Sequence, residues 1–125
     1  MIQTKRIYKK PLARDGIRIL VDRVWPRGMS KARARLVEWC KELAPSTSLR
    51  KWFGHDPTRW TQFYKRYRVE LKASGPRQAL KKLARLSTRR TLTLVYSAAD
   101  EEHNQAVALK TFLDELASRE RRKPR

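Results

Sequence analysis

The chain has 125 residues and one cysteine, Cys40, so an intramolecular disulfide is excluded. Lysine and arginine number 31 against 12 acidic residues, and the formal net charge of +19 favours anionic partners. No run approaches the roughly 18 apolar residues that cross a bilayer, and the N-terminus lacks the apolar stretch of a signal peptide. We therefore expect a soluble protein of the reducing cytoplasm, with no membrane partner.

The length of the chain suits one domain with an ordinary hydrophobic core. We place this domain at residues 1–118 and a disordered basic tail at residues 119–125, where five cations and one acid supply +4 of the net charge. The remaining +15 is spread over the domain. It is explained either by contact with nucleic acid or by an arginine bias of the source organism, and charge alone does not separate the two.

Two strands and one helix are expected in the first third of the chain. Residues 2–8 alternate imperfectly, and residues 17–22 form a β-branched, apolar run after a turn at Asp15-Gly16. Ser30 can cap a helix that ends at Pro45. Its apolar face would be formed by Ala32, Leu36, Trp39, Cys40 and Leu43. On such a face the thiol is expected to be inert packing.

Two further helices, a strand and a last helix are expected in the rest of the chain. An Asp-Pro start and an aromatic stripe predict a helix at residues 56–71, and a second helix follows at residues 76–86. Residues 91–96 have the composition of a strand, and Asp100 caps the last helix. The order predicts a small three-layer α/β domain in which helices flank a short, mostly parallel or mixed sheet.

Ligands of open α/β sheets bind beyond the carboxyl ends of the strands. Residues 22–28 follow the second strand, and there Arg23 and Arg27 flank Trp25 and a proline, an arrangement that can hold a phosphate or carboxylate. In the alternative interpretation, Asp22 pairs with one of these arginines and Trp25 seals the core.

Residues 97–104 follow the last strand and supply the second half of the expected site. Asp100 would cap the helix there, with His103 and Asn104 in its first turn, and a histidine in that place can act as acid, base or ligand near neutral pH. The alternative is a surface histidine beside an aspartate cap. We expect His103, Asp100 and Asp22 as catalytic residues. The expected ligand-binding residues are Arg23, Trp25, Arg27, Ser97, Asn104, Trp52 and His55.

Trp52 and His55 belong to residues 49–57, where cations and aromatic side chains alternate. We expect these residues to form a loop. Such a stretch can stack on a base or another planar ligand. Alternatively, Trp52 and Phe53 hold the following helix on the core, which is the use that we favour. The chain has no glycine-rich phosphate loop and no Cys/His cluster, so we expect neither a metal nor a cofactor.

Several strings taken together resemble the YeaO-like branch of the family called domain of unknown function 488. They are Asp-Arg-Val-Trp-Pro-Arg-Gly at residues 22–28, Ala-Pro-Ser at 44–46, Leu-Arg-Lys-Trp-Phe at 49–53, His-Asp-Pro at 55–57, Arg-Tyr at 66–67 and His-Asn at 103–104. The resemblance covers the chain from Lys5 to about Leu116. It implies a compact three-layer α/β domain without an agreed activity. Longer relatives carry Cys-His-Arg where this chain has Glu102-His103-Asn104, so His103 is the common element.

Two functions are the main candidates, and an interaction module with no chemistry of its own is a third. The first is binding of a small phosphorylated or nucleotide-like ligand at the strand ends, either as a binding domain or as a hydrolase or transferase. The alternative is a nucleic-acid-binding accessory or regulatory protein that uses its basic surface. The substrate, the reaction and the oligomeric state are left open by the sequence.

Overall fold

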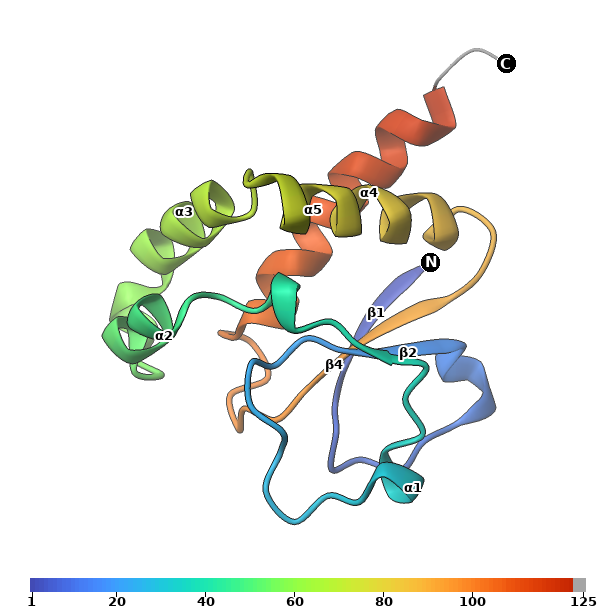
Figure 1. Ribbon diagram of the computed structural model, residues 1–125, viewed down its shortest axis with the longest axis horizontal. Helices are drawn as coiled ribbons and strands as arrows, with labels where there is room; N and C mark the ends of the chain where they lie inside the picture. Colours follow the sequence, from blue (N-terminus) through green and yellow to red (C-terminus); the bar gives the residue numbers. More distant parts are fainter. Residues whose placement is uncertain (123–125) are drawn as a thin grey trace.

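The computed structural model describes residues 1–122 and contains one four-stranded parallel sheet (Figure 1). The strands are β1 (Ile2–Arg6), β2 (Ile17–Leu20), β3 (Glu38–Trp39) and β4 (Leu92–Tyr96), in the order β1-β4-β2-β3. Every strand pair is parallel. Since β4 lies between β1 and β2, the short connection from β1 to β2 does not form an antiparallel hairpin. The predicted α/β class is confirmed, with a purely parallel sheet.

The helices are α1 (Lys31–Ala34), α2 (Thr47–Phe53), α3 (Trp60–Glu70), α4 (Ser74–Ser87) and α5 (Gln105–Arg122). Figure 1 shows α3, α4 and α5 on one side of the sheet and the short α1 on the other. Helices α4 and α5 pack on each other and on the sheet. Within residues 1–122, none of the helices has the length and apolarity that a membrane span requires.

The alternation of side chains along the strands divides the core into two clusters. In β4, Leu92, Leu94 and Tyr96 pack with the helices, whereas Val95 faces the opposite side of the sheet. A smaller cluster covers that opposite side, where the segment from β2 to β3 forms the third layer. Its buried members are Ile7, Leu20, Met29, Ala34 and Val95. In this thin layer, the segment that follows β2 lies beside the carboxyl ends of the strands.

The predicted helix over residues 30–43 is wrong: only Lys31–Ala34 is α-helical, and Lys41–Leu43 forms a single 3-10 turn. The buried guanidinium of Arg18 donates from Nε and Nη2 to the Ala34 carbonyl, at 3.0 and 2.9 Å, and Arg35 then adopts a left-handed φ of 47°. The chain continues as the edge strand β3 beside β2. Cys40 follows that strand and lies buried in the core, not on a helix face.

Residues 49–57, predicted as a loop, are largely helical. The hydroxyl of Ser46 accepts the Leu49 backbone N–H and begins α2, and Gly54 ends it with a left-handed φ of 52°. Glu70, at the end of α3, accepts the backbone N–H of Ser46 at 2.8 Å and its hydroxyl at 2.6 Å. The carboxylate thereby fixes the start of α2 to the end of α3.

The last helix begins later than predicted. Asn104 Oδ1 accepts the Val107 backbone N–H and starts α5, so His103 and Asn104 precede the helix instead of lying in its first turn. Helix α5 continues to Arg122, through residues that the sequence analysis assigned to the tail. The rest of that expected tail, residues 123–125, lies outside the described residues.

Candidate functional site

A cavity of about 460 Å³ lies beyond the carboxyl ends of β2 and β4. The segments that follow these strands both line it, together with α2, α3 and the start of α5. The lining residues are Asp22, Arg23, Val24, Trp25, Pro26, Arg27, Pro45, Arg50, Phe53, His55, Phe63, Ser97, Ala98, Ala99, Asn104 and Gln105. This is the usual location of a ligand site in a parallel sheet.

Asp22 lies at the base of the cavity, with only 7% of its surface exposed. Its Oδ2 accepts the Ser97 backbone N–H at 3.1 Å, and its Oδ1 accepts from Gln105 Nε2 at 2.5 Å. The carboxylate forms no ion pair with Arg23, Arg27 or any other residue in 1–122. Burial raises the pKa of Asp22 above its ordinary value, because the charged form is deprived of water. The Asp22 carboxyl group therefore links the segment after β2 to the segment after β4 and to α5. It takes up a proton at a higher pH than an exposed aspartate does.

Three arginine side chains line the same cavity. Arg23 donates from Nε to the Pro45 carbonyl at 2.9 Å and from Nη2 to the Ala44 carbonyl at 3.3 Å, so it braces the loop before α2 without losing its charge to a carboxylate. The exposed guanidinium groups of Arg27 and Arg50 make no hydrogen bond or ion pair within residues 1–122. Three arginines against one aspartate leave the lining net positive.

The apolar part of the lining is shared with the core. The Trp25 indole N–H donates to the Met29 carbonyl at 2.6 Å, and its ring lies edge-on to Trp39 at 5.3 Å, so Trp25 both seals the smaller cluster and borders the cavity. Phe53 and Phe63 also line the cavity, and their rings stack at a centroid distance of 4.4 Å. These side chains give the cavity flat, rigid walls.

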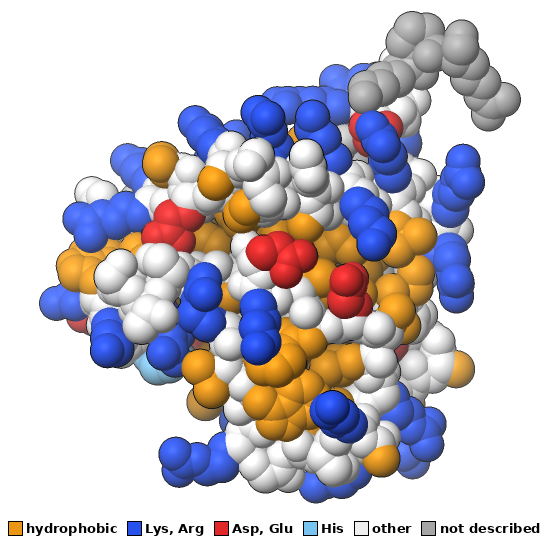
Figure 2. Space-filling model, viewed as in Figure 1, with side chains coloured by type: hydrophobic (Ala, Val, Ile, Leu, Met, Phe, Trp, Pro, Cys, Tyr) orange, Lys and Arg blue, Asp and Glu red, His pale blue; other side chains and the backbone are white. Residues whose placement is uncertain are grey.

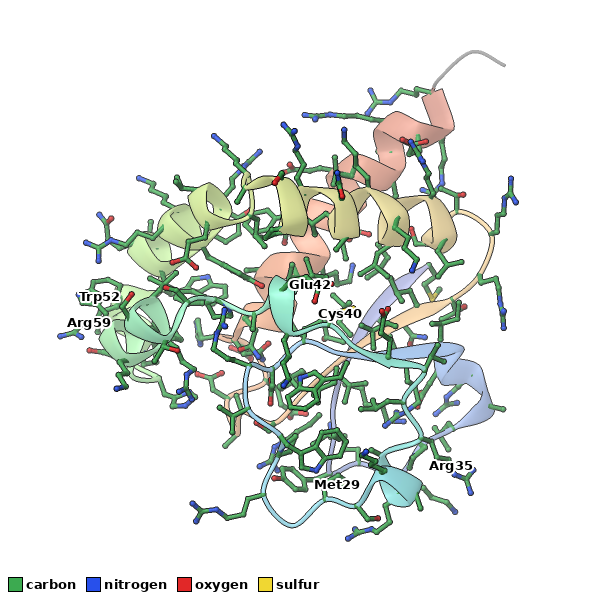
Figure 3. The ribbon with its side chains drawn as sticks, in the orientation of Figure 1. Met29, Arg35, Cys40, Glu42, Trp52 and Arg59 are labelled. Atoms are coloured by element: carbon green, nitrogen blue, oxygen red, sulfur yellow. The ribbon has the colours of Figure 1, made fainter. Side chains whose placement is uncertain are left out.

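The predicted ligand residues of the α2 segment separate in the structure. His55 lines the cavity from the turn after α2, where it adopts a left-handed φ of 57°. Trp52 does not line it, because its ring packs on the core and lies under the guanidinium groups of Arg66, at 4.2 Å, and Arg59, at 5.2 Å (Figure 3). Trp52 therefore packs on the core, and its predicted role as a ligand residue stays a prediction.

Of the segment after β4, Ser97 and Asn104 line the cavity, whereas His103 and Asp100 do not. The His103 ring lies edge-on to Trp60 at 5.5 Å, and its Nδ1 is 3.1 Å from Asp100 Oδ2. Asp100 also accepts the backbone N–H groups of Glu102 and His103, which lower the pKa of Asp100. The three residues predicted to be catalytic are thus not brought together, since only Asp22 lines the cavity.

Asn104 lines the cavity but uses its polar atoms within the fold. Its Nδ2 donates to the Asp100 carbonyl at 2.9 Å, and its Oδ1 caps α5. With 2% of its surface exposed, it is a structural part of the wall.

Sequence reasoning missed Arg50 and Gln105. Both had a readable signal in the capping residues beside them. Ser46 and Gly54 frame a short helix that carries Arg50, and Asn104 is an N-cap that places Gln105 at the first position of α5.

A family model described as "Inactive DUF488-N3 subclade" matches residues 1–125. The uncharacterised protein YeaO of Escherichia coli (strain K12) is 43% identical over 115 residues, which cover 92% of this chain and 98% of that protein. The uncharacterised proteins Rv3073c of Mycobacterium tuberculosis and Mb3100c of Mycobacterium bovis are each 37% identical over 113 residues, covering 90% of this chain and 93% of either relative. No solved structure matches the chain. The predicted resemblance is confirmed, and the chain belongs to the YeaO-like part of the DUF488 family.

Proposed function

We propose that this protein binds a small, nucleotide-like anion in the cavity at the ends of β2 and β4. One observation carries the proposal: Arg27 and Arg50, from two separate segments, border one cavity, and their guanidinium groups have no hydrogen-bonding partner within residues 1–122. Guanidinium groups bind phosphate through paired N–H donors, and two of them at one cavity can hold one phosphate.

The exposure of the lining side chains indicates which end of the cavity is open to solvent. Arg27, Arg50 and His55 are exposed and lie at its mouth, whereas Asp22 is buried at its base. The phosphate would therefore bind at the mouth, and an uncharged part of the ligand would reach inward. A carboxylate offers about four acceptor positions, and two hydrogen bonds from the protein leave room for N–H donors of a ligand. Amino and imino groups on the edge of a nucleobase are donors of this kind.

The size and walls of the cavity suit such a ligand. Its volume of about 460 Å³ lies within the range of roughly 300–1,000 Å³ that small-molecule sites occupy. The aromatic pair Phe53 and Phe63 and the buried Pro26 offer flat apolar surfaces to a planar ring.

Binding without turnover is the function that we put forward. A hydrolase or transferase needs a proton donor or acceptor held against the reacting atoms. Asp22 and His55 line the cavity, but the side chain expected for that task, His103, packs against Trp60 outside the lining, so its catalytic role stays a prediction. The matching family model is also described as inactive.

Isothermal titration calorimetry of the purified protein with GMP, AMP, CMP, UMP, ribose 5-phosphate and inorganic phosphate tests the proposal. We expect at least one nucleotide to bind more tightly than ribose 5-phosphate. R27A/R50A should weaken this binding at least tenfold, because hydrogen bonds to charged groups contribute about 1.5–3 kcal/mol each. The control R14A/R33A removes the same charge from exposed positions outside the cavity and should change affinity less than twofold. The proposal fails if no probe binds, or if the control weakens binding as much as R27A/R50A.

A further inference from the structure

A second hollow lies away from the cavity, between the C-terminal half of α4 and the end of α5. Its volume is about 860 Å³, and it shares no residue with the cavity at the strand ends. Its lining residues are Gln78, Lys81, Lys82, Arg85, Leu86, Thr88, Arg89, Glu120 and Arg121. Figure 2 shows Lys and Arg side chains gathered over α4 and the end of α5. We name this surface the α4–α5 groove.

We infer that the α4–α5 groove binds the phosphate backbone of duplex nucleic acid. Arg77, Lys81, Arg85 and Arg89 follow one another at intervals of four residues, so they form a row along one side of α4 and the turn after it. Successive members lie about 6 Å apart along the helix axis, and the row is about 18 Å long. All four side chains are exposed. The row is therefore a line of positive charge, which fits a linear polyanion.

The sequence around the row lacks the acids that would neutralise it. Residues 71–99 contain seven lysines and arginines and no aspartate or glutamate. Within residues 1–122, only Arg85 of the row has an ion pair, with Glu120 at 3.8 Å. Two of the ion pairs elsewhere on the surface are Lys9–Glu101 and Lys110–Asp114.

Repulsion between the cations of the row also lowers the stability of α4. Like charges at i and i+4 destabilise a helix, and α4 contains two such pairs of the row, Arg77 with Lys81 and Lys81 with Arg85. Solubility requires net charge but does not require this alignment. A bound polyanion would relieve the repulsion and release the counterions that the row collects.

The lining also indicates which form of nucleic acid fits. No aromatic side chain lines the groove, so it offers no platform for stacking unpaired bases. Lysine and arginine contacts to phosphates position a duplex without reading its sequence. The inferred partner is therefore a duplex that is bound through its backbone.

Fluorescence anisotropy with labelled 20-base-pair DNA duplexes of two unrelated sequences tests this inference at 50 and 200 mM salt. K81A/R85A/R89A removes three charges from the row, and K10A/R14A/R33A removes three exposed charges elsewhere. We expect the first variant to bind at least tenfold more weakly, with the slope of log affinity against log salt smaller by about 2.7, or 0.9 per phosphate contact. The second variant should stay within twofold of the wild type, and both duplexes should bind equally.

Three results would overturn the inference: equal losses in the two triple variants, a tenfold preference for one duplex sequence, or tighter binding of a single-stranded 20-mer. Circular dichroism checks the fold of each variant, and alanine is the best helix former at the exposed positions of α4. Nucleotide binding in the cavity should survive K81A/R85A/R89A, so failure of one proposal is distinguishable from failure of the other.

Discussion

Substituting Asn for Asp22 tests whether a buried carboxyl group is kept at the cavity at the expense of stability. Asn has nearly the same shape, its Oδ1 can accept the Ser97 N–H, and its Nδ2 can donate to Gln105 once that amide is turned over. No group is left unpaired, and the buried negative charge disappears. We therefore expect D22N to be more stable than the wild type at neutral pH.

The magnitude follows from opposing contributions. Two hydrogen bonds to a charged group, at about 1.5–3 kcal/mol each, become two neutral bonds of about 1 kcal/mol each. Against this loss, the variant avoids the cost of burying an ion without a counterion, which amounts to several kcal/mol. The raised pKa of Asp22 indicates that burial outweighs the hydrogen bonds, which gives the direction of the change. The difference between these opposing contributions should leave a net gain of about 1 kcal/mol. D22A, in contrast, leaves two donors without acceptors and should lose about 2–5 kcal/mol.

The pH dependence provides a second check on Asp22. Below its ordinary pKa of 3.8, the carboxyl is protonated in the folded and the unfolded chain alike. As the pH rises through the higher pKa of the folded state, the wild type loses stability relative to D22N, by at most about 1.36 kcal/mol per pH unit. Urea unfolding followed by tryptophan fluorescence from pH 4 to pH 8 measures this difference. A variant that is less stable throughout, or a difference that does not change with pH, would refute the reasoning.

Two further predictions concern groups outside the cavity. Asp15 is buried beneath Lys5 and Arg18, which donate to it at 3.1 and 2.8 Å, so D15A should lower the free energy of unfolding by about 3–5 kcal/mol in urea titrations. Burial alone would raise the pKa of Asp15, but the Leu12 backbone N–H and the two cations lower it, so its stabilisation should be lost as the pH falls below 3.8. Burial and the nearby Glu38 raise the pKa of the Cys40 thiol to about 12. Iodoacetamide at pH 8 should therefore modify Cys40 only after the protein unfolds. Rapid modification of the folded protein would contradict this.

The elements that could be predicted from the sequence are those whose pattern is set by burial. All residues of β4 are buried, and its β-branched, apolar composition shows this directly. The prediction of a helix over residues 30–43 is wrong although the apolar residues do recur at helical spacing. The structure of this segment is determined by a residue that is distant in the sequence. Arg18, in β2, binds the Ala34 carbonyl, and the backbone beyond it pairs with β2. Neither contact is visible in local periodicity.

The same distinction applies to the candidate site. The segments after β2 and β4 were predicted to meet because carboxyl ends of parallel strands lie at one edge, and the pairing of Ile19 with Leu94 places these strands side by side. The position of His103 could not be predicted in this way. Its neighbour Asn104 turns inward to cap α5, while the His103 ring packs outward on Trp60. Of two adjacent residues in this turn, Asn104 therefore borders the cavity and His103 does not.

The two proposed sites use positive charge in different ways, which is why a net charge of +19 cannot identify either. In the cavity, a buried carboxyl and apolar walls accompany the arginines, so an ion needs a fitting inner part as well as a phosphate. The α4–α5 groove has cations in a row and no such shape, so its affinity grows with the number of phosphates that are contacted. Three such contacts lose about 40-fold in affinity between 50 and 200 mM salt, whereas a ligand held partly by burial loses less. Rising salt should therefore empty the groove before the cavity.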